Sequence, residues 1–175
     1  MKYLIVSDIH GSSDSAEHIE RIFKEEKCDY ILCLGDVLYH GPRNDLPMAY
    51  APKKVIAILN PLKDKILCIK GNCEAEVDKM VLDFKIHDYY DATPNGINTH
   101  MEHGHHLDLY KGHPDMILSG HTHIPVCEMK DGILYVNPGS ITIPKAGSKR
   151  GYAILDGRNI SLYTLDNEKI MEYNL

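Results

Sequence analysis

With 175 residues, the chain is long enough to bury the core of one domain, and we expect a single domain over residues 1–175. Its 43% hydrophobic and 25% charged residues are ordinary for a soluble globular protein. The net charge of −6 argues against a nucleic-acid partner, because non-specific binding depends on Lys and Arg that neutralise phosphates. No apolar run approaches the roughly 18 residues that cross a bilayer, so we expect no membrane partner.

Cysteine use and the N-terminal residues together predict a cytoplasmic protein. The five cysteines are odd in number and show no C-x-x-C spacing, which indicates reduced thiols rather than a disulfide framework. The first residues lead directly into a strand-like run without the architecture of a signal peptide.

The front half predicts strands that alternate with helices. Residues 2–6 form the first strand, and a helix follows from Asp14, which with Glu17 would make a capping box, to about residue 26. The second strand spans 30–34. After a long polar loop at 36–52, apolar residues at 55–59 predict a second helix that Pro61 ends, and 65–69 form the third strand. This order predicts parallel strands with crossover connections.

The back half, after a short helix near 77–81, is dominated by short strands and turns. Asp131-Gly132 and Asp156-Gly157 predict hairpins. The expected strands are 88–90, 97–101, 116–118, 126–129, 133–136, 152–155 and 160–165. The fold class is therefore α/β with mixed sheets, built as a sandwich of two sheets with helices outside.

Five of the strand-like runs are each followed by a short cluster that contains Asp, Asn or His. Ligands bind at the carboxyl ends of strands in such sheets, and the chain's 11 His residues point to a metal. In extended backbone, residues i and i+2 point the same way, so Asp8 can join His10, and His121 can join His123, on one ion. The candidate metal ligands are Asp8, His10, Asp36, Asn72, His103, His121 and His123.

This set of donors suits a pair of transition-metal ions. It mixes oxygen and nitrogen without thiolate, which favours Mn, Fe, Ni, Co or Zn over Ca or Mg. Asp36 offers two oxygens, one for each ion. Two divalent ions about 3.5–4 Å apart would make hydroxide at neutral pH and clamp the oxygens of a phosphoryl group. With Asp8, Asp36 and a bridging hydroxide, the centre keeps a charge of about +1, which attracts an anionic phosphate.

Several assignments stay open on the residues alone. Any one cluster could be an ordinary loop or turn, and only their combination points to a metal centre. Neighbouring His residues compete with His103, which we prefer because it closes a strand and precedes Gly104; His105 would then support a ligand or face the substrate.

Basic residues near the site also have two interpretations. Arg43 is a candidate phosphate contact because a guanidinium fits phosphate geometry, but it could equally pair with Asp45. Lys145, Lys149 and Arg150 form a basic cluster that is either a solvated loop or the rim of a substrate site.

The clusters resemble the motif set of the calcineurin-like metallophosphoesterases: Asp8-x-His10, Gly35-Asp36, Gly71-Asn72, His103-Gly104-His105 and Gly120-His121-x-His123. The segments 35–44 and 143–145 are similar to the YfcE-type phosphodiesterases of that superfamily. The resemblance implies a four-layer α-β-β-α sandwich and a dinuclear centre, often activated by manganese. It places Asp8, His10, Asp36 and His123 on one ion, and Asp36, Asn72, His103 and His121 on the other.

Two residues depart from the wider family. Cys73 stands where relatives carry a His that assists the leaving group, and a thiol cannot replace imidazole as a general acid near neutral pH without a perturbed pKa. The YfcE-type branch shares this Cys, so the change does not imply loss of activity. Glu102 stands where relatives often have Thr before the His.

The leading hypothesis is a metal-dependent phosphodiesterase in which a metal-bridging hydroxide attacks a small phosphodiester. Asp36, Asn72 and Cys73 would be catalytic, and Arg43 and His105 would contact the substrate, with two Mn²⁺ as the expected cofactors. One alternative is a nuclease or nucleotide phosphatase on the same centre. Another is a non-catalytic scaffold, because the retromer complex contains a subunit of this fold. A homo-oligomer, dimer or tetramer, remains open.

Overall fold

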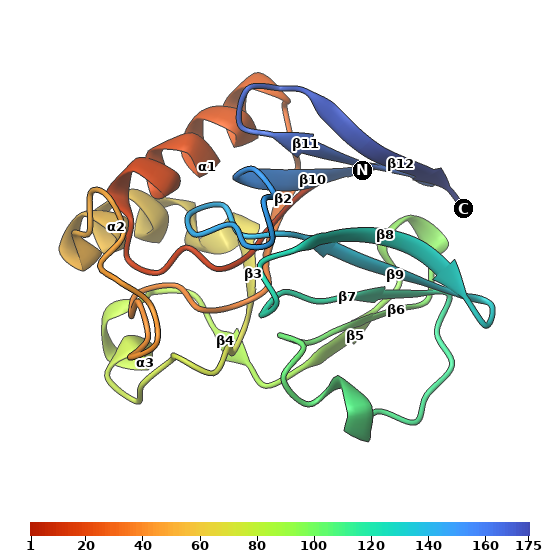
Figure 1. Cartoon of the computed structure of the whole chain (residues 1–175), viewed down its shortest axis with the longest axis horizontal. Helices are drawn as coiled ribbons and strands as arrows, with labels where there is room; N and C mark the ends of the chain where they lie inside the picture. The colour runs from red at the N-terminus through yellow and green to blue at the C-terminus, as the bar shows by residue number, and fades with distance from the viewer.

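The computed structural model describes residues 1–175 and contains two β-sheets packed face to face (Figure 1). The larger sheet has the order β12-β11-β10-β1-β2-β3-β4. The first four strands along the chain run parallel, and the last three are added antiparallel. The strands are β1 (Lys2–Val6), β2 (Tyr30–Cys33), β3 (Ile66–Ile69), β4 (Ile86–His87), β10 (Gly151–Asp156), β11 (Asn159–Thr164) and β12 (Lys169–Asn174).

The smaller sheet has the order β5-β6-β7-β9-β8. Its three central strands are parallel, and the two edge strands are antiparallel to their neighbours. The strands are β5 (Tyr90–Ala92), β6 (Thr99–Met101), β7 (Met116–Leu118), β8 (Pro125–Lys130) and β9 (Ile133–Pro138). Both sheets are therefore mixed, and the predicted fold class is confirmed.

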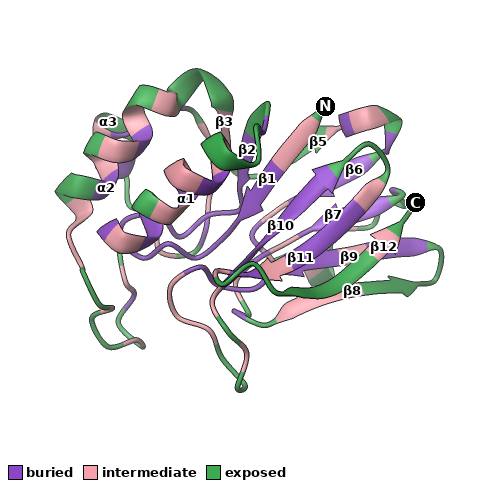
Figure 2. Cartoon of the chain, turned by 90° about the horizontal axis from the view of Figure 1, so that it is seen from above, coloured by how far each residue is buried: buried purple, intermediate pink, exposed green.

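The helices gather on the outer face of the larger sheet (Figures 1 and 2). They are α1 (Ser13–Glu25), α2 (Pro52–Leu59) and the short α3 (Asp78–Val81), and three 3₁₀ turns lie at η1 (Asn60–Lys65), η2 (Pro94–Gly96) and η3 (Leu107–Leu109). Alternate residues of β1 belong to two different hydrophobic cores. Leu4 and Val6 pack beneath the helices, and Ile5 packs between the sheets. Burial on both faces explains the unbroken apolar runs of these strands.

The outer face of the smaller sheet carries a thinner layer. The segment around η3 crosses this face (Figure 1), and the Tyr110 ring stacks on the His100 ring at 3.7 Å. The fourth layer implied by the resemblance is thus a loop with one 3₁₀ turn rather than a full helix.

Most predicted elements are confirmed, and a few details are wrong. Both predicted hairpins form. Strands β4 and β12 are additional elements: β4 has only two residues, and β12 is largely exposed, so neither has the apolar run that predicts a strand. Helix α2 ends at Leu59, before Pro61 as predicted, and the 3₁₀ turn η1 follows it over Asn60–Lys65.

The start of α1 differs from the predicted capping box. Ser12 is the N-cap, and its hydroxyl accepts a hydrogen bond from the amide of Ser15. Asp14 lies inside the first turn, where its carboxylate accepts a hydrogen bond from Arg150 at 2.6 Å. An acid in the first helical turn is also favoured by the helix dipole. The predicted N-cap, Asp14, is therefore two residues later than the actual one, Ser12.

We expect Ser12→Ala to lower the free energy of unfolding by about 1 kcal/mol, because it removes the cap of α1 and the hydrogen bond from Ser12 to the carbonyl of Met48. Glu17→Ala at an exposed position should change it by less than about 0.5 kcal/mol. Urea unfolding measures both. A larger loss of unfolding free energy for Glu17→Ala than for Ser12→Ala would support the capping box that was predicted from the sequence.

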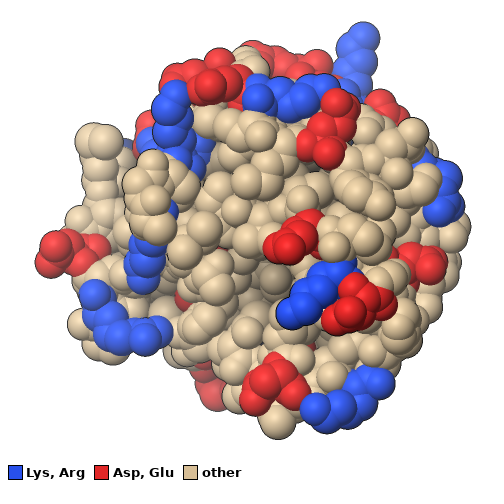
Figure 3. Space-filling view, turned by 45° about the vertical axis from the view of Figure 1, so that its right-hand side comes forward, with Lys and Arg blue, Asp and Glu red and all other residues tan.

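None of the helices combines the length and apolarity needed to cross a bilayer. On the face shown in Figure 3, acidic and basic side chains are mixed, and neither sign dominates.

Candidate metal centre

The predicted clusters meet at one edge of the sandwich. The ends of β1, β2 and β3 deliver Asp8 with His10, Asp36 and Asn72, and the parallel strands β6 and β7 deliver His103 and His121 from the facing sheet. His123 follows two residues after His121. All seven candidate ligands are therefore brought together, although they are spread over more than a hundred residues of sequence.

Three of the four candidate His ligands are held in one tautomer by the backbone. The Nδ1 atoms of His10, His103 and His123 lie 2.9, 2.6 and 2.6 Å from the carbonyl oxygens of Tyr39, Leu34 and Ile143. Each Nδ1–H donates to its carbonyl, which directs Nε2 into the site. This arrangement is typical of metal-binding His residues.

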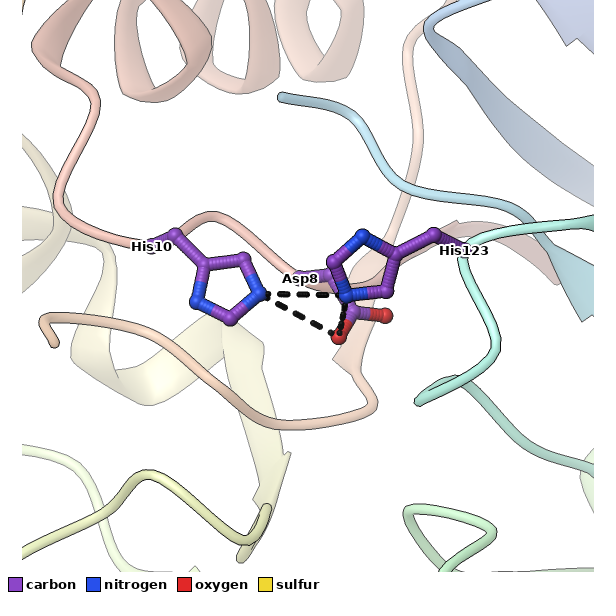
Figure 4. Close-up of side chains that lie close together, drawn as sticks. All are labelled: Asp8, His10 and His123. Carbon is purple, nitrogen blue, oxygen red and sulfur yellow. Dashed lines mark hydrogen bonds and ion pairs between the residues drawn. The ribbon is translucent and has the colours of Figure 1, made fainter. Parts of the chain in front are cut away.

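The first group consists of Asp8, His10 and His123 (Figure 4). The two Nε2 atoms are 3.2 Å apart, and Asp8 Oδ1 lies 3.6 Å from His10 Nε2 and 3.1 Å from His123 Nε2. Ligand atoms about 2.1 Å from a metal are separated by roughly 3.0–3.4 Å in octahedral or tetrahedral geometry. Asp8 Oδ1 is buried and has no hydrogen-bond partner. The spacing and the unpartnered oxygen both fit a cation held among these three residues.

The second group lies beside the first and contains Asp36, Asn72, His103 and His121. Asp36 Oδ2 is 3.4 Å from His103 Nε2, which is 3.2 Å from Asn72 Oδ1. Asn72 Oδ1 is in turn 2.7 Å from His121 Nδ1. His121 therefore offers Nδ1, whereas the other three His residues offer Nε2.

Asp36 faces both groups, but through a single oxygen. Oδ2 lies 3.7 Å from His10 Nε2 and 3.4 Å from His103 Nε2. Oδ1 instead accepts the backbone N–H of Cys73 at 2.8 Å. The expectation of one Asp36 oxygen for each ion stays a prediction, and in this structure Oδ1 also holds the Asn72 loop.

The convergence of Asp8 with His10 and of His121 with His123 does not come from extended backbone, so that reason was wrong. All four residues have positive φ, between 49° and 66°, and so does Asp36 at 56°. Residues other than glycine rarely adopt this region, and each costs on the order of 1–2 kcal/mol. Strain concentrated at these five residues is a mark of a functional site.

Glu74 is the residue that motif reasoning missed. Its Oε2 accepts the N–H of Asp36 at 3.1 Å and that of Gly71, and its Oε1 accepts the N–H of Val37 at 2.6 Å. The half-buried carboxylate thereby ties the Asp36 loop to the Asn72 loop. The only sequence signal was its position two residues after Asn72.

Of the other predicted site residues, some line the pocket and one does not. Arg43, Cys73 and Lys145 line the pocket over the candidate metal ligands. His105 does not line it; its ring lies 5.5 Å from the His103 ring and 5.9 Å from the His121 ring. Burial and the nearby His103 lower the pKa of His105 to about 4, so this ring is neutral near pH 7.

Glu102 points away from the metal ligands. Its Oε2 lies 3.6 Å from Nε2 of His100, whose Nδ1 is 2.7 Å from Asp91 on the outer face of the smaller sheet. The acid at this position therefore forms no ion pair with the candidate ligand His103 and faces His100 instead.

The charges of the metal-free site favour cation binding. Burial would raise the pKa of Asp8 and of Asp36, but hydrogen bonds with the neighbouring imidazoles outweigh it and hold both pKa values below the usual range. Burial opposes protonation of His103, yet Asp36 and Asp8 raise its pKa to about 9. In the metal-free site, the carboxylates of Asp8 and Asp36 and the proton on His103 therefore lie where a metal ion would bind.

Cys73 keeps its proton. Burial, and then the negative charge of Asp36, raise the pKa of the thiol to about 12. In the metal-free site the thiol is therefore not a thiolate near pH 7.

Comparison with known proteins agrees with the geometry. The family model described as the calcineurin-like phosphoesterase superfamily domain matches residues 1–159. The phosphodiesterase YfcE of Escherichia coli K12 is 38% identical over 98% of this chain and 96% of its own length. The solved structure of the E. coli phosphoesterase YfcE superposes with a TM-score of 0.95 at 38% identity, covering 99% of both chains.

More distant relatives share the fold. The probable metallophosphoesterase YsnB of Bacillus subtilis is 29% identical over 91% of this chain and 86% of its own length. Vacuolar protein sorting 29 of Cryptosporidium parvum superposes with a TM-score of 0.66 at 16% identity, covering 99% of this chain and 98% of its own, which shows the fold alone. The chain therefore belongs to the calcineurin-like phosphoesterase superfamily, as its motifs indicate, and to the metal-dependent class of phosphoric ester hydrolases.

Proposed function

We propose that the protein is a phosphodiesterase that works with two divalent transition-metal ions, of which Mn²⁺ is the first choice and Fe, Ni, Co or Zn are alternatives. The observation that carries the proposal is the inward direction of three imidazole Nε2 atoms around the Asp8 and Asp36 oxygens. The similarity to the phosphodiesterase YfcE supports the substrate class.

Each ion would have its own ligands and share Asp36. Asp8, His10, Asp36 and His123 would hold the first ion, and Asp36, Asn72, His103 and His121 the second. Such a pair of ions, when bound, supplies a hydroxide nucleophile near neutral pH and withdraws charge from the phosphoryl oxygens.

The protein's own groups would bind and orient the substrate. Arg43 lines the pocket and makes no ion pair with Asp45 or any other acid, so its guanidinium is free to bind a phosphoryl oxygen. Asn72 has a side-chain amide that donates to Cys73 Sγ at 3.3 Å, which fixes its oxygen toward the second group. Because the Cys73 thiol is a poor proton donor, substrates with good leaving groups should react best.

The test is hydrolysis of bis-p-nitrophenyl phosphate with each divalent ion in turn. We expect turnover with Mn²⁺ and little without added metal. Folded protein that is inactive with every ion would contradict the proposal. Faster turnover of mononucleotides or oligonucleotides than of small diesters would favour the nucleotide phosphatase or nuclease instead.

A scaffold without catalysis is less well supported. The similarity to vacuolar protein sorting 29 concerns the fold, whereas all seven candidate ligands are present and lie close together here. We further propose a cytoplasmic location, which the five free cysteines favour, and one domain over residues 1–175. Self-association as a dimer or tetramer is a prediction that light scattering would test.

We expect metal uptake at pH 7.5 to release about one proton, because the pKa of His103 is about 9 in the metal-free protein and the ligand must be neutral. Calorimetry in buffers of different ionisation enthalpy measures this release. Metal affinity should fall as the pH decreases. Metal content that is unchanged at pH 5 would contradict the assignment of His ligands.

The raised pKa of His103 also determines how the stability of the metal-free protein depends on pH. The pKa of His103 is raised from about 6.5 in the unfolded chain to about 9. Its contribution to stability is therefore complete below about pH 6.5 and lost as the pH rises through about 9.

A further inference from the structure

Two unpaired cationic side chains line the pocket over the metal ligands. Arg43 belongs to the loop between β2 and α2, and Lys145 belongs to the loop between β9 and β10. Both are exposed, and neither forms an ion pair. The other members of the basic cluster are paired, because Lys149 contacts Glu168 at 2.8 Å and Arg150 contacts Asp14 at 2.6 Å. Lys145 alone in this cluster therefore keeps a free charge, and it lies at the site.

The loop fixes the position of Lys145. Its backbone N–H donates to the carbonyl of His123 at 3.3 Å, and its own carbonyl accepts the N–H of Ser148 at 3.0 Å and the hydroxyl of Ser148 at 2.6 Å. Lys145 thus stands beside the first group of ligands. Arg43 lines the same pocket from the loop between β2 and α2, together with Asn44. The two cations therefore reach one pocket from two different loops.

The positive charge at the site exceeds what is needed to neutralise one phosphodiester. Two divalent ions bring about +4, and Asp8, Asp36 and a hydroxide return about −3, so a singly charged diester brings the centre to about zero. Glu74, if ionised, adds one more negative charge, but its oxygens bind backbone N–H groups. Arg43 and Lys145 then leave about one positive charge even when Glu74 is counted.

The pocket wall supports a polar rather than an apolar substrate arm. Of its eleven lining residues only Cys73 and Pro42 have apolar side chains, and Asp36 is the single acid. Asn44 adds a side-chain amide, which is held by a hydrogen bond to the carbonyl of His40 at 2.8 Å. An arm that ends in a phosphate would find cationic and amide donors, whereas a hydrophobic arm would find no surface to cover.

We propose that the substrate is a phosphodiester that carries a second phosphate on the arm retained after cleavage, and that Lys145 binds this second phosphate while Arg43 binds the scissile one. This inference rests on the proposed phosphodiesterase function. Lys145 is accordingly a residue that determines specificity.

The test compares two p-nitrophenyl phosphodiesters whose other arm is 2-hydroxyethyl or 2-phosphonooxyethyl. We expect the Mn²⁺-loaded wild type to prefer the phosphorylated arm at least tenfold in kcat/KM. Lys145→Ala should lower this ratio about tenfold, and Lys145→Glu should invert it. Lys149→Ala, at a paired lysine outside the pocket, should keep the wild-type ratio. A wild-type ratio below twofold, or one that survives Lys145→Ala, overturns the proposal.

A binding measurement separates this proposal from the proposed function. Calorimetry with ethyl phosphate and with ethane-1,2-diyl bisphosphate needs no turnover. If the protein hydrolyses neither ester yet binds the bisphosphate at least tenfold more tightly, and loses this preference in Lys145→Ala, the second phosphate site stands and the phosphodiesterase function fails. Equal binding of both ligands by the wild type overturns the second phosphate site.

Discussion

Asp36→Asn is expected to abolish most of the activity, by about a thousandfold or more. The substitution weakens the one oxygen that faces both groups of ligands, at 3.7 Å from His10 Nε2 and 3.4 Å from His103 Nε2. A metal ion contributes several kcal/mol of charge stabilisation to the transition state, and each 1.4 kcal/mol corresponds to about a factor of ten in rate. Both ions should therefore bind more weakly.

Asp8→Asn is the matched variant for this prediction. Asp8 Oδ1 lies 3.1 Å from His123 Nε2 but 3.9 Å from His103 Nε2, so its loss should weaken mainly the first ion. Metal content and kcat/KM measured on both variants decide the matter. Equal losses of metal in Asp8→Asn and Asp36→Asn would contradict the bridging position of Asp36.

Glu74→Ala should be the most destabilising single substitution near the site. It removes the acceptor of the backbone N–H groups of Asp36, Val37 and Gly71. Each donor left without a partner costs about 1–3 kcal/mol, so the free energy of unfolding should fall by about 3 kcal/mol or more. The Asp36 and Asn72 loops would also separate, and affinity for both ions should fall.

Glu76→Ala provides the control for Glu74→Ala, because Glu76 lies on the same loop but is exposed and forms only a surface ion pair with Lys79. Its effect on unfolding should be below about 1 kcal/mol. Urea unfolding of the metal-free variants gives the stability, and metal titration gives the affinity. If Glu74→Ala kept wild-type metal affinity, Glu74 would not position the ligands.

The sequence could predict the residues of the site more reliably than their geometry. Each candidate ligand follows a strand-like run, and the carboxyl ends of parallel strands meet at one edge of a sheet. The grouping of Asp8, Asp36 and Asn72 could therefore be predicted from the sequence. The positive φ of Asp8 and His10 could not, because neither residue is a glycine and local propensity favours other conformations there.

Other features depend on contacts that no local pattern specifies. Glu74 acts by accepting N–H groups from a loop more than thirty residues earlier in the chain. Lys145 looked like one member of a solvated basic cluster, and only the ion pairs of Lys149 and Arg150 with acids from other elements set it apart. Strand β12 is exposed over most of its length and is defined by its pairing with β11, so its sequence lacks the apolar alternation of a buried strand.

The most direct test of the central claim is the transition-metal content of the purified protein after incubation with Mn²⁺, measured beside His121→Ala. We expect about two equivalents in the wild type, as for a two-metal hydrolase, and about one in the variant, because His121 Nδ1 and Asn72 Oδ1 belong to the second group alone. Absence of bound metal in both proteins would contradict the metal centre, and the fold would then have to serve a role other than hydrolysis.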